Sequence, residues 1–262
     1  MGHVPSDWIL MRGLVREQRH WGVFPEILGR ELGARVHTTD IPGAGTQHRE
    51  TCPSTVPKIA EHIRSRWLAL RAQTERSHGA TTWGILGVSL GGMVTMAWAD
   101  AHPDDFTRIV LANTSASDVG APWDRMKPAA LLGATRGLFT RDLVERERIV
   151  LSATVRLLDA EALDALAHRW AGYAAEAPVS RATLARQVYA AARYRAPERL
   201  ASPTLVVIAG QDALAAPACG RALAARFGAQ VELHPTAGHD IGTDAPDWLA
   251  QRVGAWLGEL AA

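Results

Sequence analysis

Short apolar runs alternate with longer amphipathic segments along most of the chain, and this alternation limits the fold more than any other feature. Short runs rich in Val, Ile, Leu or Trp that end in turn residues are typical of buried strands, whereas apolar residues at three- and four-residue spacing indicate helices. Strands separated by helices need crossover connections, which produce a parallel sheet with helices on both faces. We therefore expect an α/β protein with a doubly wound, mostly parallel sheet. The predicted strands are 8–12, 35–39, 82–88, 107–112, 204–209 and 230–234, and the predicted helices are 21–32, 57–76, 90–101, 218–227 and 246–260.

The alternation fails between residues 116 and 197, where helical patterns follow one another without a convincing strand. A helical segment inserted between two strands explains this stretch most simply. Residues 1–115 and 198–262 then form the core domain, and residues 116–197 form a helical cap. Open α/β sheets bind ligands outside the carboxyl ends of their strands, so we expect the cap to lie there. The predicted helices of the cap are 128–138, 141–151, 160–174 and 183–194.

The composition is that of an ordinary soluble globular protein. A formal net charge of +1, from 28 basic and 27 acidic residues, gives no reason to expect nucleic acid or an anionic membrane as a partner. Two distant cysteines, no signal-peptide pattern and no long apolar stretch favour a cytoplasmic location. No cluster with metal-ligand spacing occurs, so we expect neither a metal nor another cofactor. The oligomeric state stays open, with a homodimer as one option.

Residues 87–91 read Gly-Val-Ser-Leu-Gly and join a predicted strand to a predicted helix. A serine on such a tight turn is held in a strained backbone conformation that exposes its hydroxyl, and side chains two residues away would collide with neighbouring backbone. The helix that follows directs free N–H groups and its positive end at the hydroxyl. A match of five residues also occurs by chance, but the strand before it and the helix after it favour a functional role. We predict that Ser89 is a nucleophile.

A serine hydroxyl needs a base to activate it and an acid to orient that base. Asp212 and His239 follow the last two predicted strands, so both residues should lie at the same sheet edge as Ser89. The chain order Ser, Asp, His is one of the orders known for such triads. Asp118 is an alternative acid, because it also follows a predicted strand, and His20 is an alternative base.

Acyl transfer also needs N–H donors for the oxyanion that forms in the transition state. The backbone N–H of Leu90, directly after the nucleophile, is one expected donor. The second is expected from the loop after the first predicted strand, where Gly13 lets the backbone approach closely and Leu14 offers its N–H. The alternative is that Gly13 only forms a turn.

Together these motifs resemble the α/β-hydrolase superfamily over nearly the whole chain. The resemblance implies a central, mostly parallel sheet, a helical cap and catalysis by a Ser-His-Asp triad, but it says much less about the substrate, because this fold hosts many chemistries. The matching segments are Gly13-Leu14, Asp40-Ile-Pro-Gly-Ala-Gly45, Gly87-Val-Ser-Leu-Gly91, Gly210-Gln-Asp212 and Gly238-His239.

The loop after the first strand departs from the family pattern. Members usually carry His-Gly there, with a histidine that supports the loop, whereas this chain has Arg12-Gly13. Arg12 either replaces the hydrogen bonds of that histidine or brings a positive charge to the site. We expect Asp240, next to the predicted base, to point away from the triad and to serve in capping or loop bonding. Arg16, Glu17 and Arg19 form an unusually charged run, which we interpret as solvated surface rather than a site for a substrate carboxylate.

These features predict a serine hydrolase that cleaves a carboxylic ester, or a related acyl bond, of a small to medium, largely apolar substrate. Two other enzymes would use the same triad, a cofactor-free perhydrolase (haloperoxidase) and a carbon–carbon bond hydrolase. A slow-turnover, receptor-like binding module is the alternative that is not an enzyme. The residues expected to line the pocket lie in the predicted cap, where packing against the core is the alternative role for each of them: Trp123, Met126, Leu131, Leu132, Phe139, Trp170 and Tyr173.

Overall fold

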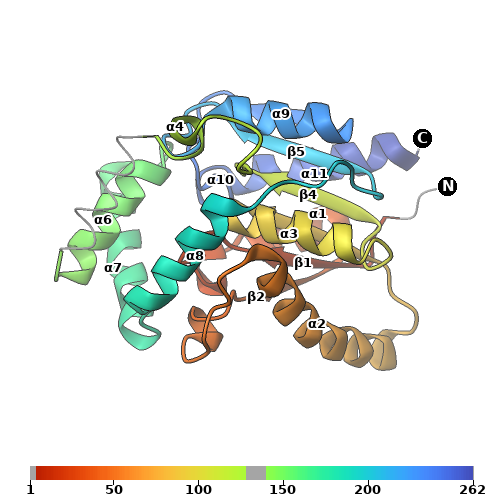
Figure 1. Ribbon diagram of the computed structural model, residues 1–262, viewed down its shortest axis with the longest axis horizontal. Helices are drawn as coiled ribbons and strands as arrows, with labels where there is room; N and C mark the ends of the chain where they lie inside the picture. The colour runs from red at the N-terminus through yellow and green to blue at the C-terminus, as the bar shows by residue number, and fades with distance from the viewer. Residues whose placement is uncertain (1–3, 128–139, 262) are drawn as a thin grey trace.

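The computed structural model describes residues 4–127 and 140–261. Its centre is one six-stranded sheet with the order β2-β1-β3-β4-β5-β6, and all neighbouring strands are parallel (Figure 1). The predicted doubly wound α/β fold is therefore confirmed, and each strand lies within one residue of its predicted bounds. The strands are β1 (Asp7–Met11), β2 (Arg35–Thr39), β3 (Trp83–Val88), β4 (Arg108–Ala112), β5 (Thr204–Ala209) and β6 (Gln230–His234).

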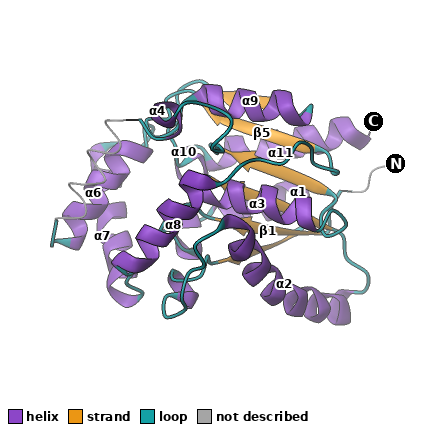
Figure 2. Ribbon diagram, in the orientation of Figure 1, coloured by secondary structure: helices purple, strands orange, loops and turns teal. Residues whose placement is uncertain are grey.

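Helices cover both faces of the sheet, so the central strands are buried on both sides (Figure 2). Successive side chains of a strand point to opposite faces. Ile9 and Met11 of β1 therefore join the hydrophobic cluster under α2 (Val56–His78), α3 (Leu90–Ala101) and α9 (Pro217–Phe227). Trp8 and Leu10 join the cluster under α1 (Phe24–Leu32) and α11 (Pro246–Ala261). The apolar runs in the sequence are nearly continuous because both faces need apolar residues.

Between β4 and β5, the described residues form helices joined by loops and contain no strand. It contains α4 (Pro122–Arg125), α6 (Leu143–Thr154), α7 (Ala160–Glu176) and α8 (Arg181–Arg193), whereas the helix predicted over 128–138 lies outside the described residues. We call residues 116–197 the helical segment. Helices α6 and α7 surround a small core of their own, which contains Leu151, Val155, Ala167 and Trp170. Helix α8 instead packs on the main core, where Ala190 is 2% exposed. That this segment is a separate cap domain stays a prediction.

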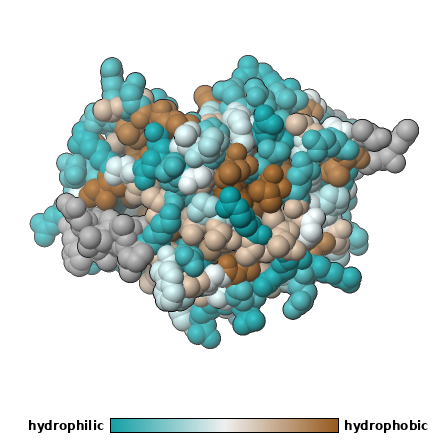
Figure 3. Space-filling view, turned by 90° about the horizontal axis from the view of Figure 1, so that it is seen from above, coloured by the Kyte–Doolittle hydropathy of each residue, from teal (hydrophilic) through white to brown (hydrophobic). Residues whose placement is uncertain are grey.

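Short helical turns complete the loops at the carboxyl ends of the strands: η1 (Gln18–Trp21), η2 (Gly45–Gln47) and α10 (Ile241–Asp244). Among the described residues, no helix has the length and apolar character needed to cross a membrane. The face seen in Figure 3 is largely hydrophilic, and its hydrophobic residues lie in small, separated groups.

One close contact inside the sheet gives a stability prediction. Gly84 of β3 is the register partner of Trp8 on β1, and a Cβ at Gly84 would lie 2.7 Å from the indole ring. We expect Gly84→Ala to lower the free energy of unfolding by about 1–3 kcal/mol, because the ring is fully buried and has little room to move. Urea unfolding followed by circular dichroism measures this change.

Gly172→Ala is the matched control. Gly172 is exposed in α7, and a Cβ added there meets nothing within 4 Å. Alanine should raise the free energy of unfolding there by roughly 0.5–1 kcal/mol, since glycine is unfavourable inside a helix. Equal effects of the two substitutions would contradict the account of the Gly84–Trp8 contact.

Candidate active site

Ser89 lies on a sharp turn between β3 and α3, with φ 57° and ψ −121°. A non-glycine residue with positive φ is strained and persists only where its surroundings hold it. The neighbouring glycines make this turn sterically accessible. A Cβ on Gly87 would collide with the Gly91 carbonyl, and a Cβ on Gly91 would collide with the Met11 carbonyl. The turn thus has the geometry predicted for a nucleophile elbow.

Asp212 and His239 meet at the carboxyl ends of β5 and β6. His239 Nδ1 lies 2.7 Å from Asp212 Oδ2, and both residues are buried. The other carboxylate oxygen of Asp212 accepts the backbone N–H groups of Leu214 and Ala215, at 2.8 and 2.9 Å. The carboxylate is therefore fixed on both sides, and it can fix the orientation of the imidazole.

The segment after β4 connects the serine turn to the histidine loop. The Thr114 hydroxyl donates to the Ser89 carbonyl at 2.6 Å, and the Asn113 amide donates to the His239 carbonyl at 2.7 Å. Asn113 Oδ1 also accepts the N–H of Ala209 at the end of β5. No direct hydrogen bond joins the Ser89 hydroxyl to His239 among the described residues. The structure brings the predicted base and acid into contact. The predicted nucleophile is connected to the base through the neighbouring residues Asn113 and Thr114, which bond the backbone carbonyls of His239 and Ser89.

The two predicted oxyanion donors belong to residues next to Ser89 or next to a residue that contacts it. Leu90 is the first residue of α3, so its N–H has no partner within the helix. Gly13 lies against the serine, because a Cβ at Gly13 would be 3.0 Å from Ser89 Cβ and 3.4 Å from its Oγ. The N–H of Leu14 donates no hydrogen bond within the described residues. Both N–H groups are thus available beside the serine.

Arg12, which stands where the family that the sequence resembles usually has a histidine, pairs with Asp240. The guanidinium donates two hydrogen bonds to the carboxylate, at 2.7 and 2.5 Å, and the Arg12 and Asp240 side chains are 4% and 7% exposed. The Arg12 guanidinium also lies 4.8 Å from the ring centroid of Trp21. Because Arg12 precedes Gly13 and Asp240 follows His239, the pair connects the β1 loop (residues 12–17) to the histidine loop. Of the two roles expected for Asp240, its side chain makes no helix-capping hydrogen bond and instead bonds a loop, the one that follows β1.

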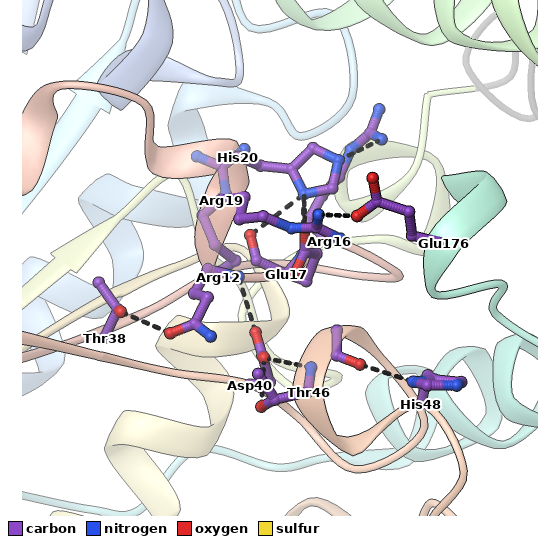
Figure 4. Close-up of polar contacts among 12 residues, drawn as sticks. Arg12, Arg16, Glu17, Arg19, His20, Thr38, Asp40, Thr46, His48 and Glu176 are labelled. Atoms are coloured by element: carbon purple, nitrogen blue, oxygen red, sulfur yellow. Dashed lines mark hydrogen bonds and ion pairs between the residues drawn. The ribbon is translucent and has the colours of Figure 1, made fainter. Parts of the chain in front are cut away.

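The interpretation of the charged run as solvated surface was wrong for two of its three residues. Arg16 and Glu17 have side chains that are 11% and 6% exposed. Arg16 pairs with Glu147 of α6 at 2.7 Å and stacks over Trp170 of α7 at 4.5 Å. Arg19, at 36% exposure, bonds both Glu17 and Glu176 of α7 (Figure 4). The run holds the β1 loop against the helical segment.

The two alternative triad residues have other partners. Burial, together with the positive charges of Arg16 and Arg12, lowers the pKa of His20 far below its ordinary value, so this imidazole stays neutral and lies edge-on to Trp170. Asp118 accepts the guanidinium of Arg226 at 2.9 Å and the N–H of Ala196 at 3.1 Å. Neither residue has the carboxylate–imidazole contact that joins Asp212 to His239.

The residues predicted to line a pocket are distributed over several environments. Trp123 and Met126 are 65% and 37% exposed. Trp170 is 2% exposed in the small core of the helical segment, and Tyr173 packs beside that core under the Arg19 guanidinium. Leu131, Leu132 and Phe139 lie outside the described residues. In the described part of the chain, Trp170 and Tyr173 therefore contact the charged run that follows β1.

A family model for the alpha/beta hydrolase fold matches residues 13–246. The chain belongs to this family. Among solved structures with the fold, a hydrolase from Pseudomonas aeruginosa PA01 is 23% identical, with a TM-score of 0.72 over 97% of this chain and 90% of that one. An enol-lactonase from Burkholderia xenovorans LB400 is 20% identical, with a TM-score of 0.69 over 98% and 92%. A thioesterase of the prodiginine pathway in Streptomyces coelicolor is 18% identical, with a TM-score of 0.61 over 95% and 85%. No curated protein matches by sequence.

These identities establish that the α/β-hydrolase fold is shared, and they do not extend to the activity. Two residues that organise the site, Asn113 and Asp244, were not predicted from the sequence. Asn113 has φ 45°. The only local sign of its role was its place, with Thr114, directly after a predicted strand. Asp244 accepts the N–H of Gly238 at 2.6 Å and the N–H groups of Arg156 and Leu157, so it connects the histidine loop to the helical segment.

Charges of both signs act on the predicted base, His239. Burial by itself would lower the pKa of His239, but the carboxylates of Asp212 and Asp240 outweigh it, and the pKa is raised above its ordinary value while Arg12 opposes the rise. Since a group within a few ångströms changes a pKa according to its own sign, the two partners of the Arg12–Asp240 pair should shift His239 in opposite directions.

We therefore expect Asp240→Asn to lower the pKa of His239 and Arg12→Met to raise it. The double variant should lie between them, because it removes both charges. Titration of the imidazole resonances by NMR in the free protein measures these shifts without reference to activity. Asp118→Asn is the control, since Asp118 is paired with Arg226, and it should leave the pKa of His239 unchanged. Shifts of the same sign in both single variants would contradict the account.

Each single variant should also be less stable by roughly 3–5 kcal/mol, because it leaves a buried charge unpaired.

Proposed function

We propose that this α/β-hydrolase-fold protein is a serine hydrolase that cleaves a carboxylic ester, or a related acyl bond, of a small to medium, largely apolar substrate. The observation that carries the proposal is the 2.7 Å contact of His239 with Asp212 in a loop that Asn113 anchors beside the Ser89 turn. A buried carboxylate–imidazole pair next to a strained serine supports nucleophilic catalysis, because the hydroxyl needs a base and the base needs an orienting acid.

In the proposed mechanism, His239 removes the proton of the Ser89 hydroxyl as its oxygen attacks the acyl carbon. Asp212 holds the imidazole by Nδ1 and stabilises the imidazolium that forms. The N–H groups of Leu14 and Leu90 stabilise the oxyanion, and His239 then protonates the leaving group. Water hydrolyses the resulting acyl-enzyme with His239 again as the base. The raised pKa of His239 favours its role as a proton acceptor.

The helical segment is proposed to act as a lid that shapes the substrate pocket. Thr154 at the end of α6 accepts the backbone N–H of Asp240, and Gly238 lies so close to Thr154 that a Cβ at Gly238 would be 2.5 Å from its carbonyl oxygen. These contacts support a position of the segment over the histidine loop. Trp170 and Tyr173 would reach the substrate side through their contacts with the β1 loop and η1.

The nucleophile is tested by Ser89→Ala with p-nitrophenyl acetate as the probe ester. We expect kcat/KM to fall at least about a thousandfold, because the remaining groups can only bind and polarise the ester. A fluorophosphonate should label the parent protein at Ser89 and leave the variant unlabelled. Ser65→Ala is the control, since Ser65 is exposed on α2, and it should hydrolyse the ester and react with the phosphonate as the parent does. Undiminished hydrolysis by Ser89→Ala would disprove the assignment.

The same preparation separates the other functions that a triad allows. A single burst of p-nitrophenol with almost no turnover would indicate a receptor-like module. Peracid formation from acetate and hydrogen peroxide would indicate a perhydrolase, and cleavage of a diketone without ester turnover would indicate a carbon–carbon bond hydrolase. An ester series of graded acyl length then measures the size of the pocket. Steady turnover with a preference for short or medium acyl chains is the result that we expect.

A further inference from the structure

The loop that carries Leu14 contains a strained residue, as the serine turn does. Val15 has φ 54°, a left-handed conformation that a β-branched side chain rarely adopts. The N–H of Arg16 donates to the Gly13 carbonyl at 3.3 Å, so residues 13–16 form a β-turn with Leu14 and Val15 at its centre. Positive φ at the third residue alone is the pattern of a type II turn, which normally requires glycine or asparagine there. Something outside the turn must therefore hold Val15.

This turn fixes the direction of the Leu14 N–H. The Gly13 carbonyl points into the turn to accept the N–H of Arg16. In a trans peptide the carbonyl and the following N–H point in opposite directions, so the Leu14 N–H points out of the turn. Gly13 lies against the Ser89 side chain. A stable turn therefore fixes the direction of one proposed oxyanion donor, in the residue next to the one that contacts Ser89.

The group that holds Val15 comes from the helical segment. Gln187 of α8 accepts the Val15 N–H on its Oε1 at 2.9 Å, and the Gln187 side chain is completely buried. Its Nε2 is also buried and has no hydrogen-bond partner among the described residues. Buried polar groups are normally hydrogen-bonded, and the bond from the Val15 N–H is the contact that Gln187 Oε1 makes here.

Helix α8 is itself held firmly against the core. Ser180 caps its first turn by accepting the Thr183 N–H at 3.0 Å. Thr183 lies so close to Gly43, which has φ 88°, that a Cβ on that glycine would be 2.5 Å from the threonine methyl group. At the other end of the helix, Ala190 is buried in the main core cluster. Gln187 therefore acts from a fixed position.

We propose that Gln187 is a positioning residue for the oxyanion hole. It keeps the Leu14–Val15 peptide in the strained orientation of the type II turn and so holds the Leu14 N–H toward the acyl oxygen. This inference rests on the proposed function of Ser89. It also assigns a role in the chemistry to the helical segment, because α8 supplies the acceptor.

The decisive variant is Gln187→Met, which keeps the volume of the side chain and removes the acceptor. With p-nitrophenyl acetate we expect kcat to fall about tenfold, while KM changes less than about twofold. The fall in kcat is smaller than the loss that follows complete removal of an oxyanion donor, because the donor is displaced and not removed. The rate of inactivation by a fluorophosphonate should fall in parallel, because its phosphoryl oxygen also occupies the hole. Val188→Met is the matched control: Val188 is the next residue on α8 and 46% exposed, so the variant should keep the parent's kcat.

Two further variants separate positioning from a loss of packing. Gln187→Glu keeps an acceptor for the Val15 N–H, so kcat should stay within about threefold of the parent's. Val15→Gly removes the strain, because glycine adopts positive φ without cost. In that background Gln187→Met should lower kcat less than about threefold, since the turn no longer needs the glutamine. Equal losses in both backgrounds, or a change in KM alone, would overturn the inference.

Thermal unfolding shows whether the Gln187→Met variant folds. If that variant does not fold, the Gln187→Glu variant decides. A folded Gln187→Glu variant that loses as much activity as Ser89→Ala would overturn the inference, and one that keeps the parent's kcat would support it. Ser89→Ala is assayed in parallel. Survival of activity in that variant would overturn the proposed function. Loss of activity there, with no effect of Gln187→Met, would overturn only the role of Gln187.

Discussion

The parallel pairing of β1, β3, β4 and β5 is the constraint on which the rest of the structure depends. Parallel strands end at one edge of a sheet, so the segments that follow them are brought together whatever their distance along the chain. In this protein the loop after β1, the serine turn, the Asn113-Thr114 pair and the loop of Asp212 all start at that edge. Their side chains then need few additional bonds to form one site.

Those bonds are long-range and largely buried. Asn113 joins the end of β5 to the histidine loop, Arg12 joins the β1 loop to Asp240, and Asp244 joins the histidine loop to the helical segment. A buried ion pair is not by itself a source of stability, because desolvation offsets the attraction. The Arg12–Asp240 pair is better understood as a register device that fixes two loops relative to each other. Its two charges also shift the pKa of His239 in opposite directions, so the positions of the two loops and the pKa of the base are coupled.

Gln187 and the charged run that follows β1 bring the helical segment into the same network. Arg16 and Arg19 pair with Glu147 and Glu176, and Gln187 holds the N–H of Val15. Every one of these contacts joins the region after β1 to a helix between β4 and β5. The conformation of the proposed oxyanion loop is therefore not local, and it depends on where α6, α7 and α8 sit.

The sequence by itself determined the order in which strands and helices follow one another along the chain. It also determined the bounds of most helices and the location of the serine turn. It could do so because hydrophobic periodicity and turn chemistry are properties of neighbouring residues, such as the glycines at 87 and 91. It also indicated Asp212 and His239, since both follow strands. Only the tertiary structure decided which charges are buried. Arg16 and Glu17 look like solvated residues when read locally. The carboxylate partner of Arg16, Glu147, lies more than a hundred residues along the chain, and Glu17 is buried although its partner Arg19 is only two residues away. The partner of Arg12 and the acceptor of the Val15 N–H follow from how separate elements dock, which no local pattern encodes.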